Sequence, residues 1–334
     1  MTIQPLSSPA REISVTAIIE PAFERVKRML FQPFDLGKWF TLGFCAWLAG
    51  FGESGGGGSG FNWNNGGSHQ VNGRSGGEEF RHFYFQARDY VAANISWILP
   101  VAVILLVLGL AIWLLVLWLN SRGKFMFLHC VALDKAEVEA PWRQYAAAAN
   151  SLFRFRLVLG LAGLVVMLPL LVLILAVIVR MVLRGEPDAP GVLTAVGLGL
   201  GFILLALGFA LIHKLLVDFV VPIMYLRGGS CLAAWGEFFG LLKANFGQFA
   251  LYVLFVLVLN MAIGVIVLLA ILLTCCLAGC LMLLPFVGTV VLLPVLVFKR
   301  AYPLYYLAQY GAQYDVFPAA PASPPPPLPA GLAP

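Results

Sequence analysis

The residues able to carry out chemistry are few, and the most notable of them lie inside or beside long apolar segments. Lys214 and Asp218 stand four residues apart, so on a helix they share a face and are expected to form an ion pair. A lysine that reaches the water interface beside a neutralising acid is favoured over a proton or ion relay. Asn260 lies in the middle of another apolar segment. Its amide is expected to hydrogen-bond a neighbouring helix rather than a substrate.

Histidine and cysteine do not occur at spacings that bind metals or build activated nucleophiles. The sequence has four histidines: His69, His82, His129 and His213. None of them forms a metal-ligand pattern with another histidine or a cysteine, and no HExxH or GxSxG motif occurs within a predicted span. The only cluster of cysteines comprises Cys275, Cys276 and Cys280. Packing at a helix turn is favoured there over a metal site or a disulfide, so we expect no enzymatic activity and no cofactor.

The composition places these residues in a membrane protein. Of the 334 residues, 61% are hydrophobic and only 11% are charged. A soluble domain carries about 25% charged residues, so this chain cannot cover a water-facing surface and must expose most of its surface to lipid. The net charge of +5 is small and dispersed, and it does not indicate a nucleic-acid partner.

Six apolar segments predict the membrane spans. They are residues 36–51, 95–119, 157–182, 192–212, 249–274 and 280–298. The segment at 36–51 is short, so it either crosses a locally thinned bilayer or re-enters on the same side. Gly197 and Gly201 form a GxxxG pattern in the fourth span, which predicts close packing against another helix.

A basic, amphipathic segment precedes the first span. Phe23, Val26 and Leu30 recur at helical spacing, and the residues between them are largely charged. Pro33 ends this helix before the apolar run begins. The residues assigned to the lipid interface are Arg25, Lys27, Arg28, Lys38 and Trp39.

The same order of segments recurs three times. Amphipathic segments at 21–31, 141–153 and 230–246 each precede a pair of spans, and each second span is followed by basic residues and about ten further apolar residues. The fold class is therefore all-α: a polytopic membrane helical bundle with six spans in three hairpin-like repeats, each preceded by an interfacial amphipathic helix. The alternative is a plain series of hairpins with interfacial helices and no repeat.

Three segments fall outside the predicted transmembrane domain of residues 21–314 or interrupt it. Residues 1–20 form a flexible lead, residues 52–77 a glycine-rich loop, and residues 315–334 a proline-rich tail. The tail is favoured as an extended tether, and a docking segment for a protein partner is the alternative.

The distribution of positive charge predicts the orientation. With the N-terminus inside, sixteen of the 21 lysines and arginines lie on the inner side of the six spans. Since basic residues are enriched in cytoplasmic loops, both termini are expected to be cytoplasmic.

Two motifs carry a resemblance to a known group of proteins. Residues 31–40 read FQPFDLGKWF and residues 218–228 read DFVVPIMYLRG. With the Phe-Asn-Trp of the glycine-rich loop, they resemble a family of uncharacterised bacterial multi-pass membrane proteins. More distantly, the chain is similar to the membrane portion attached to some glycerophosphodiester phosphodiesterases. The resemblance implies a bacterial inner-membrane protein and supplies no activity, because the catalytic barrel of the phosphodiesterases is missing here.

These observations favour a non-enzymatic membrane protein that acts as a scaffold or as a regulator of the envelope or of lipid state, with membrane lipids as its partners. The alternative is a transporter or permease for a neutral or lipid-like substrate. Its path would run near Asn260, Pro169 and Pro285.

Overall fold

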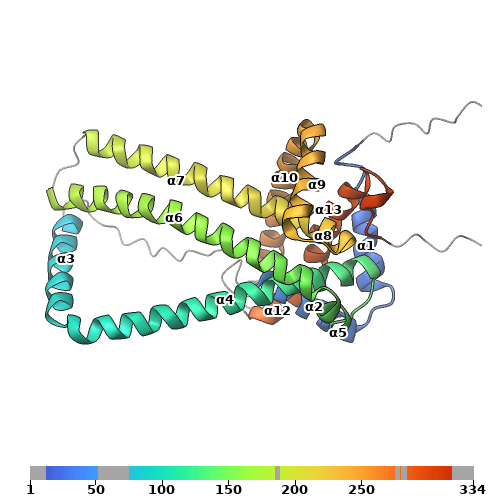
Figure 1. The fold of residues 1–334 in the computed structure, drawn as a ribbon, viewed down its shortest axis with the longest axis horizontal. Helices are drawn as coiled ribbons and strands as arrows, with labels where there is room; N and C mark the ends of the chain where they lie inside the picture. The colour runs from blue at the N-terminus through green and yellow to red at the C-terminus, as the bar shows by residue number, and fades with distance from the viewer. Residues whose placement is uncertain (1–12, 52–74, 185–188, 275–278, 280–283, 318–334) are drawn as a thin grey trace, which may run out of the picture.

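A computed structural model describes residues 13–51, 75–184, 189–274, 279 and 284–317, and over these residues every regular element is a helix. The elements are α1 (Ile19–Phe31), α2 (Leu36–Gly50), α3 (Ser75–Ala93), α4 (Ile95–Leu133), α5 (Glu139–Gln144), α6 (Ala146–Arg184), α7 (Ala189–Leu215), the π-helix η1 (Leu216–Val220), α8 (Val221–Arg227), α9 (Cys231–Ala244), α10 (Phe246–Leu273), α12 (Pro285–Val291), α13 (Leu293–Ala308) and the short 3-10 helix η2 (Ala312–Tyr314). The α4, α6 and α7 helices extend to one side of a compact core, and α3 lies across their far ends (Figure 1).

Four described helices are long and apolar enough to cross a membrane: Ile95–Leu133, Ala146–Leu183, Ala189–Arg227 and Phe246–Leu273. They contain the predicted spans at 95–119, 157–182 and 192–212, and the span at 249–274 except for its last residue, Thr274. In the first three, no residue of the most apolar stretch is buried by protein, so that surface is available to lipid. The six spans and the threefold repeat are not confirmed by the described residues.

The α2 helix occupies a different place from that expected of a span at 36–51. It runs antiparallel to the last third of α4, because Lys38 Nζ lies 2.9 Å from Asp134 Oδ1 and Asn120 at the other end donates to Ala49 O. The α2 helix therefore lies beside the part of α4 that follows residue 119, and not beside the predicted span. It has 15 residues, and about 20 are needed to cross the hydrocarbon core. The described residues thus do not confirm a crossing by α2, which stays a prediction.

The predicted span at 280–298 is described only from residue 284 onward. There the chain forms α12 and, after Leu292, α13. The α13 helix continues through Lys299 and Arg300 to Ala308. Likewise, α4 continues past Arg122, so these basic residues lie inside continuous helices and do not end them.

The core is built by the three apolar continuations that follow the basic residues. Residues 125–132 of α4 are buried, and so are most of residues 216–224 of η1 and α8 and most of residues 301–307 of α13. Aromatic and polar contacts join them: the rings of Phe219 and Tyr306 lie 6.0 Å apart, and a hydrogen bond of 3.0 Å joins His129 Nδ1 to the Tyr225 hydroxyl. The spans are thus held together at one end by a protein-filled core, which the hydrophobic effect stabilises.

The amphipathic α1 helix turns its apolar side toward this core. Val26 and Leu30 are buried, and α1 packs against α13. Of the three apolar residues expected on the lipid-facing side, only Phe23 is exposed, at 61%. The periodicity correctly marked an apolar face, but for Val26 and Leu30 the apolar partner is protein.

The end of the predicted flexible lead is held in place. The Ser14 backbone N–H donates to Gln309 Oε1 at 2.8 Å, Gln309 Nε2 donates to Ser14 O at 3.0 Å, and the Tyr302 hydroxyl donates to Val15 O at 2.7 Å. Residues 1–12, the glycine-rich segment 52–74, the cluster Cys275, Cys276 and Cys280, and the tail from 318 lie outside the described residues. Residues 75–77 of the predicted loop begin α3.

Close helix packing occurs at a glycine other than those of the GxxxG pattern. A Cβ atom at Gly197 or Gly201 would meet nothing within 4 Å, so these glycines do not mediate a helix contact. At Gly123 a Cβ atom would lie 2.6 Å from Ala49 N and 2.6 Å from Leu48 C. Since those atoms belong to the backbone of α2, only glycine allows α4 to approach α2 this closely.

We predict that Gly123→Ala destabilises the protein by about 1–3 kcal/mol, because the added methyl group forces the α2 and α4 backbones apart. Gly197→Ala is the matched control and is expected to be neutral or stabilising by up to about 1 kcal/mol, since alanine favours the helix and meets no atom there. Unfolding in mixed micelles with increasing sodium dodecyl sulfate, followed by tryptophan fluorescence, measures both. Equal midpoints for the two variants would contradict this packing.

Candidate functional site

A buried polar cluster lies where the apolar helices enter the core. We call it the polar junction, and it consists of Asn120 and Ser121 of α4 and Arg156 of α6. Arg156 Nη1 donates to Asn120 Oδ1 at 2.5 Å and to Ser121 Oγ at 3.3 Å, and the Ser121 hydroxyl donates to Leu117 O at 2.7 Å. All three residues are less than 9% exposed. Because burying a charge is costly unless it is hydrogen-bonded, these contacts are what hold the guanidinium inside.

The polar junction also provides hydrogen-bond donors for the backbone carbonyl groups at the end of α2. The last carbonyl groups of a helix have no partner within the helix. Asn120 Nδ2 donates to Ala49 O at 2.6 Å and to Phe51 O at 3.0 Å, and it lies 3.4 Å from Leu48 O. One amide side chain therefore links the end of α2 to α4 and, through its oxygen, to Arg156 of α6.

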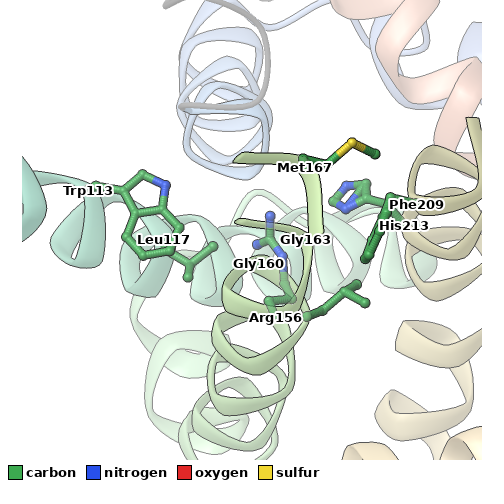
Figure 2. Close-up of a pocket in the computed structure, with 9 residues that line it drawn as sticks. Trp113, Leu117, Arg156, Gly160, Gly163, Met167, Phe209 and His213 are labelled. Carbon is green, nitrogen blue, oxygen red and sulfur yellow. The ribbon is translucent and has the colours of Figure 1, made fainter. Parts of the chain in front are cut away.

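A pocket opens beside the polar junction, between α4, α6 and α7. Its volume is about 310 Å³, and it is lined by Trp113, Leu117, Arg156, Leu159, Gly160, Gly163, Met167, Phe209 and His213. Figure 2 shows Arg156 in the middle of this group, with Trp113 on one side and Phe209 and His213 on the other. We call it the junction pocket. Apart from Arg156 and His213, its walls are mainly apolar, and its volume lies at the lower end of the range of ligand sites.

The predicted pair of Lys214 and Asp218 forms, and it has a third member. Lys214 Nζ lies 2.6 Å from Asp218 Oδ2, and the Tyr252 hydroxyl of α10 donates to the same oxygen at 2.9 Å. The Asp218 side chain is buried, whereas that of Lys214 is 40% exposed. The ion pair is therefore confirmed, and the lysine has the partial exposure expected of a cation that reaches an interface.

A π-helical turn positions Asp218, and Pro222 accounts for it. Proline has no N–H and its ring clashes with the carbonyl four residues earlier, so an α-helix cannot continue regularly through Pro222. In the wider turn, the Val221 N–H donates to Leu216 O, and Val217 O would need the absent N–H of Pro222. Arg300 Nη1 of α13 supplies a donor to Val217 O at 2.9 Å.

Three residues predicted for the lipid interface instead form hydrogen bonds or an ion pair with other residues of the protein. Arg25 donates to Val131 O at 2.9 Å and to Ala132 O at 2.7 Å, which are carbonyl groups at the end of α4. Trp39 Nε1 donates to Leu30 O at 2.8 Å, at the end of α1.

The third of them, Lys38, pairs with Asp134, the residue that follows α4 in the left-handed conformation. By contrast, Lys27 and Arg28 are exposed, and Lys27 lies 3.7 Å from Glu24. Of the five predicted interface residues, Lys27 and Arg28 therefore have the side chains most open to a lipid surface.

The amide of Asn260 does not hydrogen-bond a neighbouring helix in the structure. Its Nδ2 donates to Val256 O, one turn earlier in α10, at 2.8 Å. The expected interhelical bond is therefore wrong for this donor. A local bond of this kind satisfies an amide in an apolar helix without a partner helix.

Among the described residues, no group of three or more histidine, cysteine or acidic side chains could hold a metal ion. Burial raises the pKa of the Cys231 thiol to about 12, so this thiol is protonated near neutral pH and is a poor nucleophile. On the same helix, Glu237 has a lowered pKa, first because Arg227 donates a hydrogen bond to it at 2.9 Å.

The sequence did not predict that Asn120, Ser121 and Arg156 form one cluster. It indicated only that Asn120 and Ser121 follow a span and that Arg156 precedes one. Arg156 follows Asn120 by 36 residues and Ser121 by 35, so no local spacing joins it to them. One pattern in the sequence could have predicted the cluster: an amide, a hydroxyl and an arginine each lie directly beside an apolar segment of span length.

Comparison with known proteins identifies a family for this chain but no activity. A family model of unknown function, DUF7544, matches residues 13–292, and the chain belongs to that family. No curated protein and no solved structure matches the chain. The predicted membership of an uncharacterised family is thus confirmed, and the similarity to the membrane portion of the phosphodiesterases stays a prediction.

We predict that Asn120→Ala destabilises the protein by about 2–4 kcal/mol, because it leaves carbonyl groups of α2 and a donor of Arg156 without their buried partner. Asn150→Ala is the matched control: its amide accepts from Trp118 Nε1 at the surface, and we expect a change of no more than about 0.5 kcal/mol. The same micellar unfolding assay measures both. Comparable losses in the two variants would show that the polar junction does not contribute specially to stability.

Proposed function

We propose that this protein is a non-enzymatic, multi-pass module of the bacterial inner membrane that acts as a scaffold or regulator of lipid state. The four long apolar helices support its placement in a membrane. The excess of basic residues on one side of the predicted spans supports cytoplasmic termini. The recurring order of segments in the sequence supports six spans in three hairpin-like repeats, built around the three buried continuations.

The observation that carries the proposal is an exposed aromatic corner between α1 and α2. It consists of Phe23, Phe31, Phe34, Leu36 and Phe40, each at least 50% exposed. Lys27 and Arg28 are exposed on the same α1 helix. Aromatic rings beside basic side chains are the combination that enters the interface of an anionic membrane, where the rings bury apolar surface and the charges attract lipid headgroups.

The α9 helix offers a second surface of the same kind. Leu232 is 72% exposed and Phe239 is 47% exposed, while Trp235 and Phe238 face the core. Ser230 caps this helix by accepting from the Ala233 N–H, which stabilises its first turn. With the aromatic corner, it gives the core two apolar surfaces for contact with the inner leaflet.

A permease for a neutral or lipid-like substrate is the second candidate function. The junction pocket favours it, because the pocket lies between three helices long enough to cross a membrane. Movement of labelled lipid or solute across vesicles containing the protein, above the leak of empty vesicles, would support the permease over the scaffold.

We predict that p-benzoyl-phenylalanine placed at Phe23 or Phe34 forms lipid adducts on irradiation of the protein in nanodiscs with anionic lipid, because both side chains face outward at the aromatic corner. The control position is Phe219, which is fully buried and is expected to crosslink only to protein. Mass spectrometry of the irradiated protein separates lipid adducts from internal crosslinks.

Replacing Lys27 and Arg28 with glutamate should reduce lipid adducts at Phe23 by about threefold or more, since each basic residue contributes about 1 kcal/mol of attraction. Adducts at Phe219 equal to those at Phe23 and Phe34 would refute the aromatic corner.

The proposed orientation gives a separate prediction. A fluorescent protein fused to the C-terminal end of the chain should be fluorescent, and alkaline phosphatase at the same place should be inactive, because the fusion stays in the cytoplasm. The same reporters inserted within residues 185–188, between the predicted spans at 157–182 and 192–212, should behave in the opposite way. Active phosphatase at the C-terminal end would overturn the proposed topology.

A further inference from the structure

We propose that Arg122, held between Trp118 and Trp142, binds the headgroup phosphate of one anionic phospholipid of the inner leaflet, with Arg154 as a second basic group. We call these four residues and Asn150 the headgroup site. The inference rests on the proposed function only for the location and orientation of α4 and α6 in a bilayer. It adds a lipid class and a defined site to the membrane contacts proposed for α1 and α9.

The headgroup site lies where two predicted spans end. Trp118 is the second-last residue of the span in α4, Arg122 follows that span by three residues, and Arg154 precedes the span in α6 by three residues. A hydrogen bond of 3.2 Å from Trp118 Nε1 to Asn150 Oδ1 joins the two helices there. Because Arg154 follows Asn150 by four residues, it lies on the same face of α6. Both arginines are therefore placed at the depth of the lipid headgroups, on the side proposed as cytoplasmic.

Two indole rings hold the Arg122 guanidinium in a fixed orientation. Its Cζ atom lies 4.7 Å from the centroid of the Trp118 ring and 4.7 Å from that of the Trp142 ring. The two rings stand at 88° to each other with their centroids 5.9 Å apart, and Arg122 Nη1 donates to Trp142 O at 3.2 Å. The rings attract the cation and carry no charge of their own, so the guanidinium keeps its positive charge.

Arg122 has hydrogen-bonding capacity that the protein does not use. Its Nε is buried without an acceptor, and its Nη2 donates to no other described residue and is not enclosed by protein. Among the described residues, no acidic side chain forms an ion pair with Arg122 or Arg154. By contrast, Arg143, which follows Trp142, pairs with Glu139 at 2.8 Å. Since a guanidinium matches the oxygens of a phosphate, a headgroup phosphate at Nη2 would supply an anionic acceptor that the protein lacks there.

The surface continues from the two arginines onto apolar faces of the spans. Leu115, which is 60% exposed, precedes Trp118 by three residues, and Val158, which is 66% exposed, follows Arg154 by four. Each pair lies on one face of its helix, with the apolar member closer to the membrane centre. A phospholipid has the same order of groups along its length. A free phosphate ion would gain nothing from these apolar side chains, which favours a lipid as the source of the phosphate.

The test is photocrosslinking from Leu115, beside the headgroup site. p-Benzoyl-phenylalanine replaces Leu115 of the full chain in nanodiscs with equal amounts of dioleoyl-phosphatidylglycerol and dioleoyl-phosphatidylcholine, and mass spectrometry identifies the lipid in each adduct. We expect phosphatidylglycerol adducts to exceed phosphatidylcholine adducts by about tenfold or more, since each of two arginines contributes about 1 kcal/mol of attraction, or about fivefold. At Leu106, which is 71% exposed and nine residues farther into the span, the two lipids should react equally.

Variants assign the preference to the two arginines. Arg122→Gln and Arg154→Gln should each lower the ratio of the two adducts at Leu115 by about fivefold. Arg122→Lys should lose part of the preference, because an ammonium group keeps the charge but lacks the planar fork of a guanidinium. Arg143→Gln is the matched control: it removes one positive charge beside the site, from a side chain that pairs with Glu139, and should leave the ratio unchanged.

Equal amounts of the two adducts in the unmodified protein would overturn the proposal. Losses in Arg122→Gln and Arg154→Gln no larger than in Arg143→Gln would do the same. If added inorganic phosphate abolishes the preference while sodium chloride of equal ionic strength does not, the site belongs to a soluble anion and the proposal fails. If Arg122→Gln does not fold, Arg154→Gln decides, since that side chain is exposed. Lipid adducts at Phe23 and Phe34 report on the proposed function separately, so either can fail while the other stands.

Discussion

The structure depends on satisfying backbone carbonyl groups at places where no water is available. Asn120 donates to the end of α2, Arg25 donates to the end of α4, and Arg300 donates to Val217 beside a proline. Each donor comes from a different helix, so each bond that satisfies a carbonyl also fixes one helix against another. In an apolar protein of this composition, few polar side chains are available for this work, and an unpaired carbonyl in hydrocarbon costs several kcal/mol. Arg300, which is buried, thus contacts a backbone carbonyl that the helix itself leaves without a partner.

The same constraint connects the core to the junction pocket. Arg156 is held by Asn120, which at the same time closes α2, so the orientation of the guanidinium is determined by the packing of three helices. Gly123 brings α2 close enough to α4 for Asn120 to reach its carbonyl groups.

Continuous helices join the lipid-facing part of the protein to its core. The α4 helix and the helix at 189–227 each contain an exposed apolar part, a basic residue and a buried part. The hydrophobic effect acts on both apolar parts, but lipid covers one and protein covers the other. The basic residue between them, Arg122 or Lys214, marks the change of environment. The core thus fixes the positions of the spans at one end, while their outer parts contact few other elements.

The sequence predicted the features that depend on residues close to one another in the chain. Four apolar segments of span length, the pair of Lys214 and Asp218, and the helix before the first predicted span all depend on residues close in the chain, and the structure contains each of them. The predicted segment at 141–153 instead divides between α5 and the start of α6. Tertiary structure decided which surface covers each apolar face, because hydrophobic periodicity does not distinguish lipid from protein. It placed Val26 and Leu30 against the core, α2 beside the end of α4, and the close helix contact at Gly123 instead of Gly197. It also assembled Asn120, Ser121 and Arg156, whose partners are distant in the chain and are specified only by packing.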